Sequence, residues 1–117
     1  MVQQSQCTRA RSKELKTAPP REAVFQRKLI KKLRQIPNSF WFVKEAKSIR
    51  GLPDLIGVIN GRPVYLECKR SISEAQHNTG RIVLQRKVLR DAERAGAYTS
   101  FIYPENEQEI LDILGTL

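Results

Sequence analysis

Histidine and cysteine are scarce in this sequence. It contains one histidine, His77, and two cysteines, Cys7 and Cys68, and no CxxC spacing occurs. A structural zinc site needs about four such ligands at short spacings, and a disulfide framework needs several cysteine pairs. The sequence therefore excludes both. A bound metal ion would have to be held by oxygen ligands, which favours Mg²⁺ or Mn²⁺.

Long apolar segments are also missing. No run of about 18 apolar residues is present, and the N-terminus lacks the apolar stretch that forms the core of a signal peptide. We therefore expect a cytoplasmic protein with no membrane partner.

Acidic residues are few. The 117 residues include 12 Asp and Glu against 21 Lys and Arg, which gives a formal net charge of +9. Such a balance favours a polyanionic partner, because phosphate backbones attract basic proteins by Coulomb forces and counterion release. Ribosomal and membrane-surface proteins share it, so charge alone does not specify the partner. The length is that of one compact domain, so one site must serve the whole chain.

The sequence divides into a basic leader and one domain. Residues 1–18 contain few large apolar side chains and cannot bury enough surface to offset the entropy of ordering, which predicts a flexible basic arm. Residues 19–117 form the predicted domain. Its first element is an amphipathic helix between Pro20 and Pro37. The apolar residues at helical spacing are Val24, Phe25, Leu29, Ile30, Leu33 and Ile36.

Three strands are predicted next, at 40–43, 55–59 and 63–66. Asn60-Gly61 joins the last two, and Asn-Gly between apolar runs is a strong hairpin signal, because both central residues of a type I′ turn need positive φ. Trp41 and Phe42 in the first strand are more typical of a core or a dimer interface than of a base-stacking platform.

The remainder follows a simpler pattern. The polar segment 71–81 predicts a loop, and a second helix follows it, with Gly96 as its stop signal. Residues 97–103 predict a strand and 105–114 a closing helix. The order is helix, three strands, helix, strand, helix, which predicts an α/β fold with a mixed central sheet flanked by helices.

The hairpin brings charged residues together. With Asn60-Gly61 as a two-residue turn, facing residues have numbers that sum to 121, so Asp54 faces Glu67. Facing residues share one side of the sheet, and like charges there are destabilising unless something positive lies between them. Lys69 projects on that same side because strand side chains alternate.

These residue types suit phosphodiester hydrolysis. Carboxylates can hold a hard cation, and the lysine can orient or deprotonate a water or offset charge on the phosphate. Asp54 could instead be a turn residue, and Glu67 with Lys69 an ordinary exposed pair. The apolar neighbours Leu66 and Cys68 argue against that simpler interpretation.

Gly51-Leu52-Pro53-Asp54, followed after a gap by Glu67-Cys68-Lys69, resembles the PD-(D/E)XK nuclease signature. The chain from about Glu22 to Tyr103 resembles its virus-type replication-repair branch, the VRR-NUC domain. The resemblance rests also on Glu22 followed by Gln26 in the first helix, and on Gln85 at the start of the second.

The resemblance implies a restriction-endonuclease-like α-β-β-β-α-β core and one or two Mg²⁺ or Mn²⁺ ions. The implied metal ligands are Asp54, Glu67, the backbone carbonyl of Cys68 and, directly or through water, Glu22. Lys69 and Gln85 would complete the catalytic set. Stand-alone members of this branch resemble Holliday junction resolvases, which implies branched DNA as the substrate, a homodimer, and a nucleoid or phage-infected host cytoplasm as the location.

Simpler interpretations exist for the accessory residues. The negative charge of Glu22 would be stabilised by the helix dipole at the helix N-terminus, with no metal needed to explain it. Gln85 could be an ordinary residue of a helix N-terminus. Basic residues of the second helix are candidate phosphate contacts, although such residues are usually only solvated. They are Arg81, Arg86, Lys87 and Arg90.

Three functions therefore stand side by side. The first is a metal-dependent, structure-selective DNA endonuclease. The second is a catalytically inactive DNA-binding module with a nuclease fold. The third is a basic RNA-binding or ribosome-associated protein.

Overall fold

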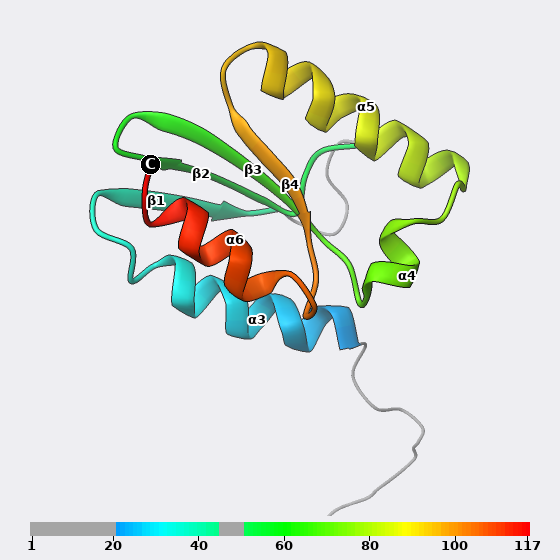
Figure 1. Ribbon diagram of the computed structural model, residues 1–117, viewed down its shortest axis with the longest axis horizontal. Coiled ribbons are helices and arrows are strands. Elements are labelled where there is room, and N and C mark those ends of the chain that lie inside the picture. Colours follow the sequence, from blue (N-terminus) through cyan, green and yellow to red (C-terminus); the bar gives the residue numbers. More distant parts are fainter. Residues whose placement is uncertain (1–20, 45–50) are drawn as a thin grey trace, which may run out of the picture.

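The computed structural model describes residues 21–44 and 51–117, so the predicted arm at 1–18 lies outside the described residues. These form a four-stranded sheet between helices (Figure 1). The elements in chain order are α3 (Arg21–Leu33), β1 (Ser39–Val43), β2 (Leu55–Ile59), β3 (Arg62–Cys68), α4 (Ile72–Ala75), α5 (Gly80–Arg94), β4 (Tyr98–Ile102) and α6 (Glu107–Leu114). The predicted α/β class is confirmed.

The sheet is mixed, as predicted, with strand order β1-β2-β3-β4. The first three strands are antiparallel, and β4 returns through α5 to lie parallel to β3. The predicted hairpin register is confirmed from Ile59 opposite Arg62 to Leu55 opposite Leu66. Asn60 (φ 49°) and Gly61 (φ 84°) supply the positive φ angles that the tight turn requires.

The prediction of a loop at 71–81 was wrong. Ser71 begins the short helix α4 by accepting a hydrogen bond from the Glu74 amide, and Thr79 caps α5 by accepting one from the Ile82 amide. These side chains satisfy amide groups that the first turn of a helix leaves unpaired, so polar residues here start helices. The first helix is shorter than predicted, because α3 ends at Leu33 and not at Ile36.

The core lies between one face of the sheet and the helices α3 and α6 (Figure 1). Alternate strand residues such as Leu55, Leu66 and Cys68 are fully buried there, so the predicted core position of the Cys68 thiol is confirmed. Trp41 packs on the same side and is 4% exposed, whereas Phe42 is 61% exposed. The core interpretation therefore holds for Trp41 and not for Phe42.

The other face of the sheet is covered only in part. Helix α5 packs against β4 and β3, and no other helix of residues 21–44 and 51–117 covers the β1–β2 side of this face (Figure 1). The described residues contain no helix that is both long and apolar enough to cross a membrane.

Candidate active site

Asp54 and Glu67 meet at the open end of the β2–β3 hairpin. Asp54 directly precedes β2, and Glu67 is the penultimate residue of β3. The Asp54 amide donates to Glu67 Oε1 (3.2 Å), and the Cys68 amide donates to Asp54 Oδ2 (2.9 Å). The strand pairing of the hairpin ends at Leu55 opposite Leu66, and directly beyond it these two hydrogen bonds from backbone amides hold the two carboxylates beside each other.

Lys69 and Gln85 both contact Glu67, Lys69 from just after the same strand and Gln85 from a helix. Lys69 directly follows β3, and its Nζ lies 3.6 Å from Glu67 Oε2. Gln85 comes from α5 and donates from Nε2 to the same oxygen (2.9 Å). Glu67 and Lys69 are 1% and 4% exposed, and Asp54 and Gln85 are buried as well. The four predicted catalytic residues thus form one buried cluster, which we call the acidic cluster: Asp54, Glu67, Lys69 and Gln85.

The acidic cluster holds an excess of negative charge when both carboxyl groups are ionised, because two carboxylates stand against one ammonium. The pKa of Glu67 is raised from 4.5 to about 8. The largest cause is burial of its carboxyl group, and the second is the negative charge of the neighbouring Asp54. The positive charge of Lys69 lowers the pKa, but by less. A carboxyl group in this position either keeps its proton near neutral pH or needs a further positive charge. Burial likewise raises the pKa of the Cys68 thiol, which therefore stays protonated.

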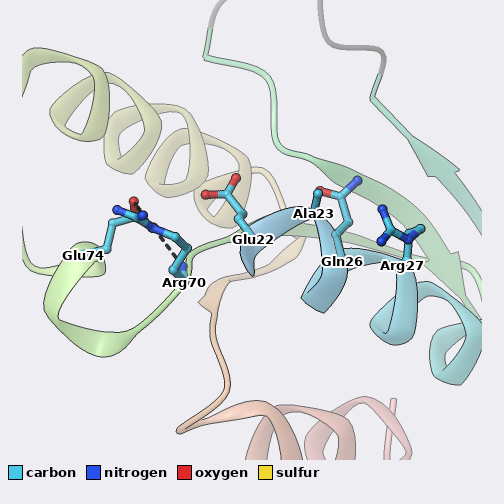
Figure 2. Close-up of a pocket in the computed structure, with 6 residues that line it drawn as sticks. All are labelled: Glu22, Ala23, Gln26, Arg27, Arg70 and Glu74. Carbon is cyan, nitrogen blue, oxygen red and sulfur yellow. Dashed lines mark hydrogen bonds and ion pairs between the residues drawn. The ribbon is translucent and has the colours of Figure 1, made fainter. Parts of the chain in front are cut away.

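Glu22 lies at the border of the acidic cluster. Its carboxylate is half buried, and this burial is the largest cause of a raised pKa. The negative charges of Asp54 and Glu74 also raise the pKa, and the positive charges of Lys69 and Arg81 lower it. Glu22 also lines a cavity of about 500 Å³ beside the cluster, together with other residues of α3 and of the segment after β3 (Figure 2). Those residues are Ala23, Gln26, Arg27, Arg70 and Glu74.

The donor set suits a hard cation in its chemistry. Two buried carboxylates share a small volume, and hard divalent ions such as Mg²⁺ and Mn²⁺ prefer carboxylate oxygens to nitrogen or sulfur ligands. In the described part of the chain, however, no three His, Cys, Asp or Glu side chains converge as a ready-made metal site. Asp54 and Glu67 are therefore a pair, and the ligand roles of Glu22 and of the Cys68 carbonyl remain predictions.

The basic residues of α5 differ in what they contact. Arg86 is tied into the protein, because its guanidinium donates to Asn78 and to the carbonyls of Ala75 and His77. Lys87 pairs with Asp91 at 2.8 Å on the exposed side of the helix. Arg81 and Arg90 are exposed. Arg81 is close enough to Glu22 to lower the pKa of that carboxyl group, so it lies on the side of the acidic cluster.

Three neighbours of the acidic cluster were not predicted from the sequence. Phe101 of β4 is the register partner of Glu67, and its ring centroid lies 5.7 Å from Lys69 Nζ. Lys44 donates from Nζ to the Leu52 carbonyl (3.1 Å) in the segment that leads to Asp54. Arg70 lines the cavity and pairs with Glu74. Only Arg70 carried a sequence signal, its position next to Lys69, since the other two depend on strand pairing.

Comparison with protein-family models, curated proteins and solved structures finds no match to this chain. The evidence for function is therefore the chemistry of the acidic cluster and its surroundings.

Proposed function

We propose that this chain is a metal-dependent DNA endonuclease with a PD-(D/E)XK core of the VRR-NUC type, acting on branched DNA. The observation that supports this most directly is the buried pair Asp54–Glu67 with Lys69 beside it. A surface pair of this composition would be unremarkable. A buried pair costs desolvation energy, and proteins retain such arrangements mainly where the charges are used.

Asp54 and Glu67 would hold one Mg²⁺ or Mn²⁺ ion, with the Cys68 carbonyl and Glu22 as further ligands. When bound, such an ion polarises a phosphoryl oxygen and stabilises the charge that develops during hydrolysis. The amide of Cys68 fixes the direction of the Asp54 carboxylate, and the amide of Asp54 does the same for Glu67. Each carboxylate is thus oriented by the backbone of the opposite strand.

Lys69 and Gln85 act on the reacting groups and on Glu67. The Lys69 ammonium, 3.6 Å from Glu67, would orient the attacking water or offset the charge on the phosphate. Gln85 donates to Glu67 Oε2 and keeps that carboxylate aimed into the acidic cluster. The net charge of +9 supports a phosphodiester substrate, as do Arg27 and Arg70 in the cavity that Glu22 lines and Arg81 close to Glu22.

The test is cleavage of labelled four-way junction, flap and linear duplex DNA, at fixed salt, in Mg²⁺, in Mn²⁺ and in EDTA. We expect cleavage of the branched substrates that needs a divalent ion. Glu67→Gln and Lys69→Met change the acidic cluster with little change in side-chain volume, and each should lower the rate at least about 100-fold while binding is kept. Glu93→Gln, on the exposed side of α5, is the matched control and should cut normally.

Other outcomes would assign another function. Binding of branched DNA without cleavage in either ion would indicate an inactive DNA-binding module. Preferential RNA binding with no divalent-ion dependence would indicate an RNA-associated protein. Cleavage retained by Glu67→Gln and Lys69→Met would refute the assignment of the active site.

A further inference from the structure

A hollow of about 290 Å³ lies between α5 and β4. The residues that line it include one with an aromatic ring, two with guanidinium groups and one with a hydroxyl group. They are Phe101, Arg86, Arg90 and Thr99. We call this surface the Phe101 hollow. An aromatic ring beside arginines is typical of sites for single-stranded nucleic acid, because bases stack on the ring and phosphates pair with the guanidinium groups.

Phe101 connects this hollow with the acidic cluster. It is the register partner of Glu67, and its ring centroid lies 5.7 Å from Lys69 Nζ. Phe101 is only partly buried, although Glu67 and Lys69 are almost fully buried. A base stacked on this ring therefore lies one side chain away from the lysine that we propose to act at the scissile phosphate.

The charged residues of the hollow differ in what they contact. Arg86 is held by its hydrogen bonds to α4 and to the segment that follows it. Arg90 is exposed and forms no ion pair within residues 21–44 and 51–117, because the neighbouring Asp91 pairs with Lys87. Glu93 also lines the hollow, but its carboxylate is exposed and repels phosphate, so we assign it no contact. Arg90 is thus the residue placed to pair with a phosphate.

The backbone of β4 adds polar groups at the same place. The Ile102 carbonyl accepts a hydrogen bond from the Lys69 amide, so Ile102 and every second residue before it face β3. Thr99 and Phe101 therefore turn their amides and carbonyls to the outer edge of the sheet. Of these groups, the Phe101 carbonyl accepts from side chains, and no strand of the described residues pairs with this edge. The remaining amides and carbonyl suit the polar edge of a base.

We propose that the Phe101 hollow binds one unpaired base of the DNA strand next to the scissile phosphate. The base stacks on the Phe101 ring, and Arg90 pairs with a phosphate of the same strand. The position of the scissile phosphate rests on the proposed function. A paired base must first leave its partner and its stack, which costs energy. The hollow therefore favours branched DNA with an unpaired nucleotide at the cut, such as a flap, over a fully paired junction.

The first experiment measures stacking without cleavage. A thymidine strand that carries one 2-aminopurine is titrated with the full chain at low salt in EDTA, because 2-aminopurine loses fluorescence when it stacks. We expect quenching by the wild type and by Phe101→Tyr, which keeps a ring. Phe101→Leu should quench little and bind about 5–100-fold more weakly.

Phe42→Leu is the matched control, because it removes a ring that is 61% exposed and lies outside the hollow. It should behave as the wild type. Equal quenching by the wild type and Phe101→Leu, no quenching by the wild type, or a loss of quenching in Phe42→Leu would overturn the proposal.

The second experiment tests Arg90 through the salt dependence of the same binding. Arg90→Gln should lower the slope of log K against log salt concentration by about 1, because one phosphate contact is lost. Arg34→Gln removes an exposed arginine just after α3 and should leave the slope unchanged. An unchanged slope for Arg90→Gln, or equal changes in both variants, would refute the phosphate contact.

Cleavage separates this inference from the proposed function. The wild type should cut a flap faster than a fully paired four-way junction, and Phe101→Leu should lose that preference. A preference that survives in Phe101→Leu would overturn the role of the hollow while the nuclease stands. If no DNA is cut in Mg²⁺ or Mn²⁺ but quenching still depends on Phe101, the nuclease proposal fails and the base-binding hollow stands.

Discussion

Glu67 should make the metal-free protein less stable as the pH rises. Its pKa in the folded chain is about 8, against an ordinary value of 4.5, mainly because the carboxylate is buried and lies beside Asp54. Between these two values the folded state binds more protons than the unfolded state. The contribution of Glu67 to stability is therefore fully present below about pH 4.5 and is lost as the pH rises to about 8.

The magnitude follows from the displacement of the pKa. At about 1.36 kcal/mol per pH unit, a change from 4.5 to about 8 corresponds to at most about 5 kcal/mol. That is a large share of the roughly 5–15 kcal/mol by which a typical domain is stable. A divalent ion held by the pair would restore part of it, about 2.7 kcal/mol at a concentration of 100 Kd.

The comparison that isolates this effect is wild type against Glu67→Gln, since all other titrating groups are common to both. The substituted amide is neutral at every pH, and it can donate to Gln85 Oε1, a buried oxygen that has no hydrogen-bond partner within the described structure. Urea unfolding at constant ionic strength with EDTA, from pH 5 to pH 9, gives both free energies of unfolding.

We expect the stability of the wild type relative to Glu67→Gln to fall across this range, and Mg²⁺ or Mn²⁺ to raise it again at pH 8 for the wild type alone. A constant difference between the two proteins would show that Glu67 titrates normally. Equal stabilisation of both by Mn²⁺ would show that Glu67 does not help to hold the ion.

Three further predictions concern residues around the acidic cluster and the core. Gly57→Ala should lower the free energy of unfolding in urea by about 1–3 kcal/mol, because a Cβ there would lie only 2.6 Å from Cδ2 of Trp41; the exposed neighbour Val58→Ala should cost much less. Gln85→Ala should weaken Mn²⁺ binding by roughly 10–100-fold in calorimetry, because Glu67 loses the donor that orients it, and unchanged affinity would argue against this role. Arg86→Ala should speed amide hydrogen exchange at the end of α4 and in the segment that follows it, because Arg86 donates to the carbonyls of Ala75 and His77 there. The salt dependence of DNA binding should stay the same, and a reduced salt dependence would show that Arg86 contacts phosphate.

The sequence was sufficient for the hairpin and for the pair that it positions. Asn60-Gly61 determines the turn type, and the turn determines the register as far as Leu55 opposite Leu66. The next residues, Asp54 and Glu67, then lie side by side, so each step depends only on local chemistry. The same reasoning does not reach Phe101. Its place beside Lys69 depends on a parallel pairing between β3 and β4, and parallel register is determined by how α5 packs across the sheet.

Glu22 marks the limit of prediction for the acidic cluster. The sequence motif predicts that a helical glutamate precedes the hairpin. The distance of this glutamate from Asp54, however, depends on how α3 packs against the sheet, which it does through Leu29 and Leu33. Its carboxylate lies near enough to Asp54 for the two charges to interact, yet it also lines a cavity that contains Arg27 and Arg70. Asp54 and Glu74 raise the pKa of the Glu22 carboxyl group and Lys69 and Arg81 lower it, so three carboxylates stand against two cations. A rotation of its side chain toward Asp54 would add a third carboxylate to the pair, and the cation itself would favour that rotation by offsetting the repulsion between them.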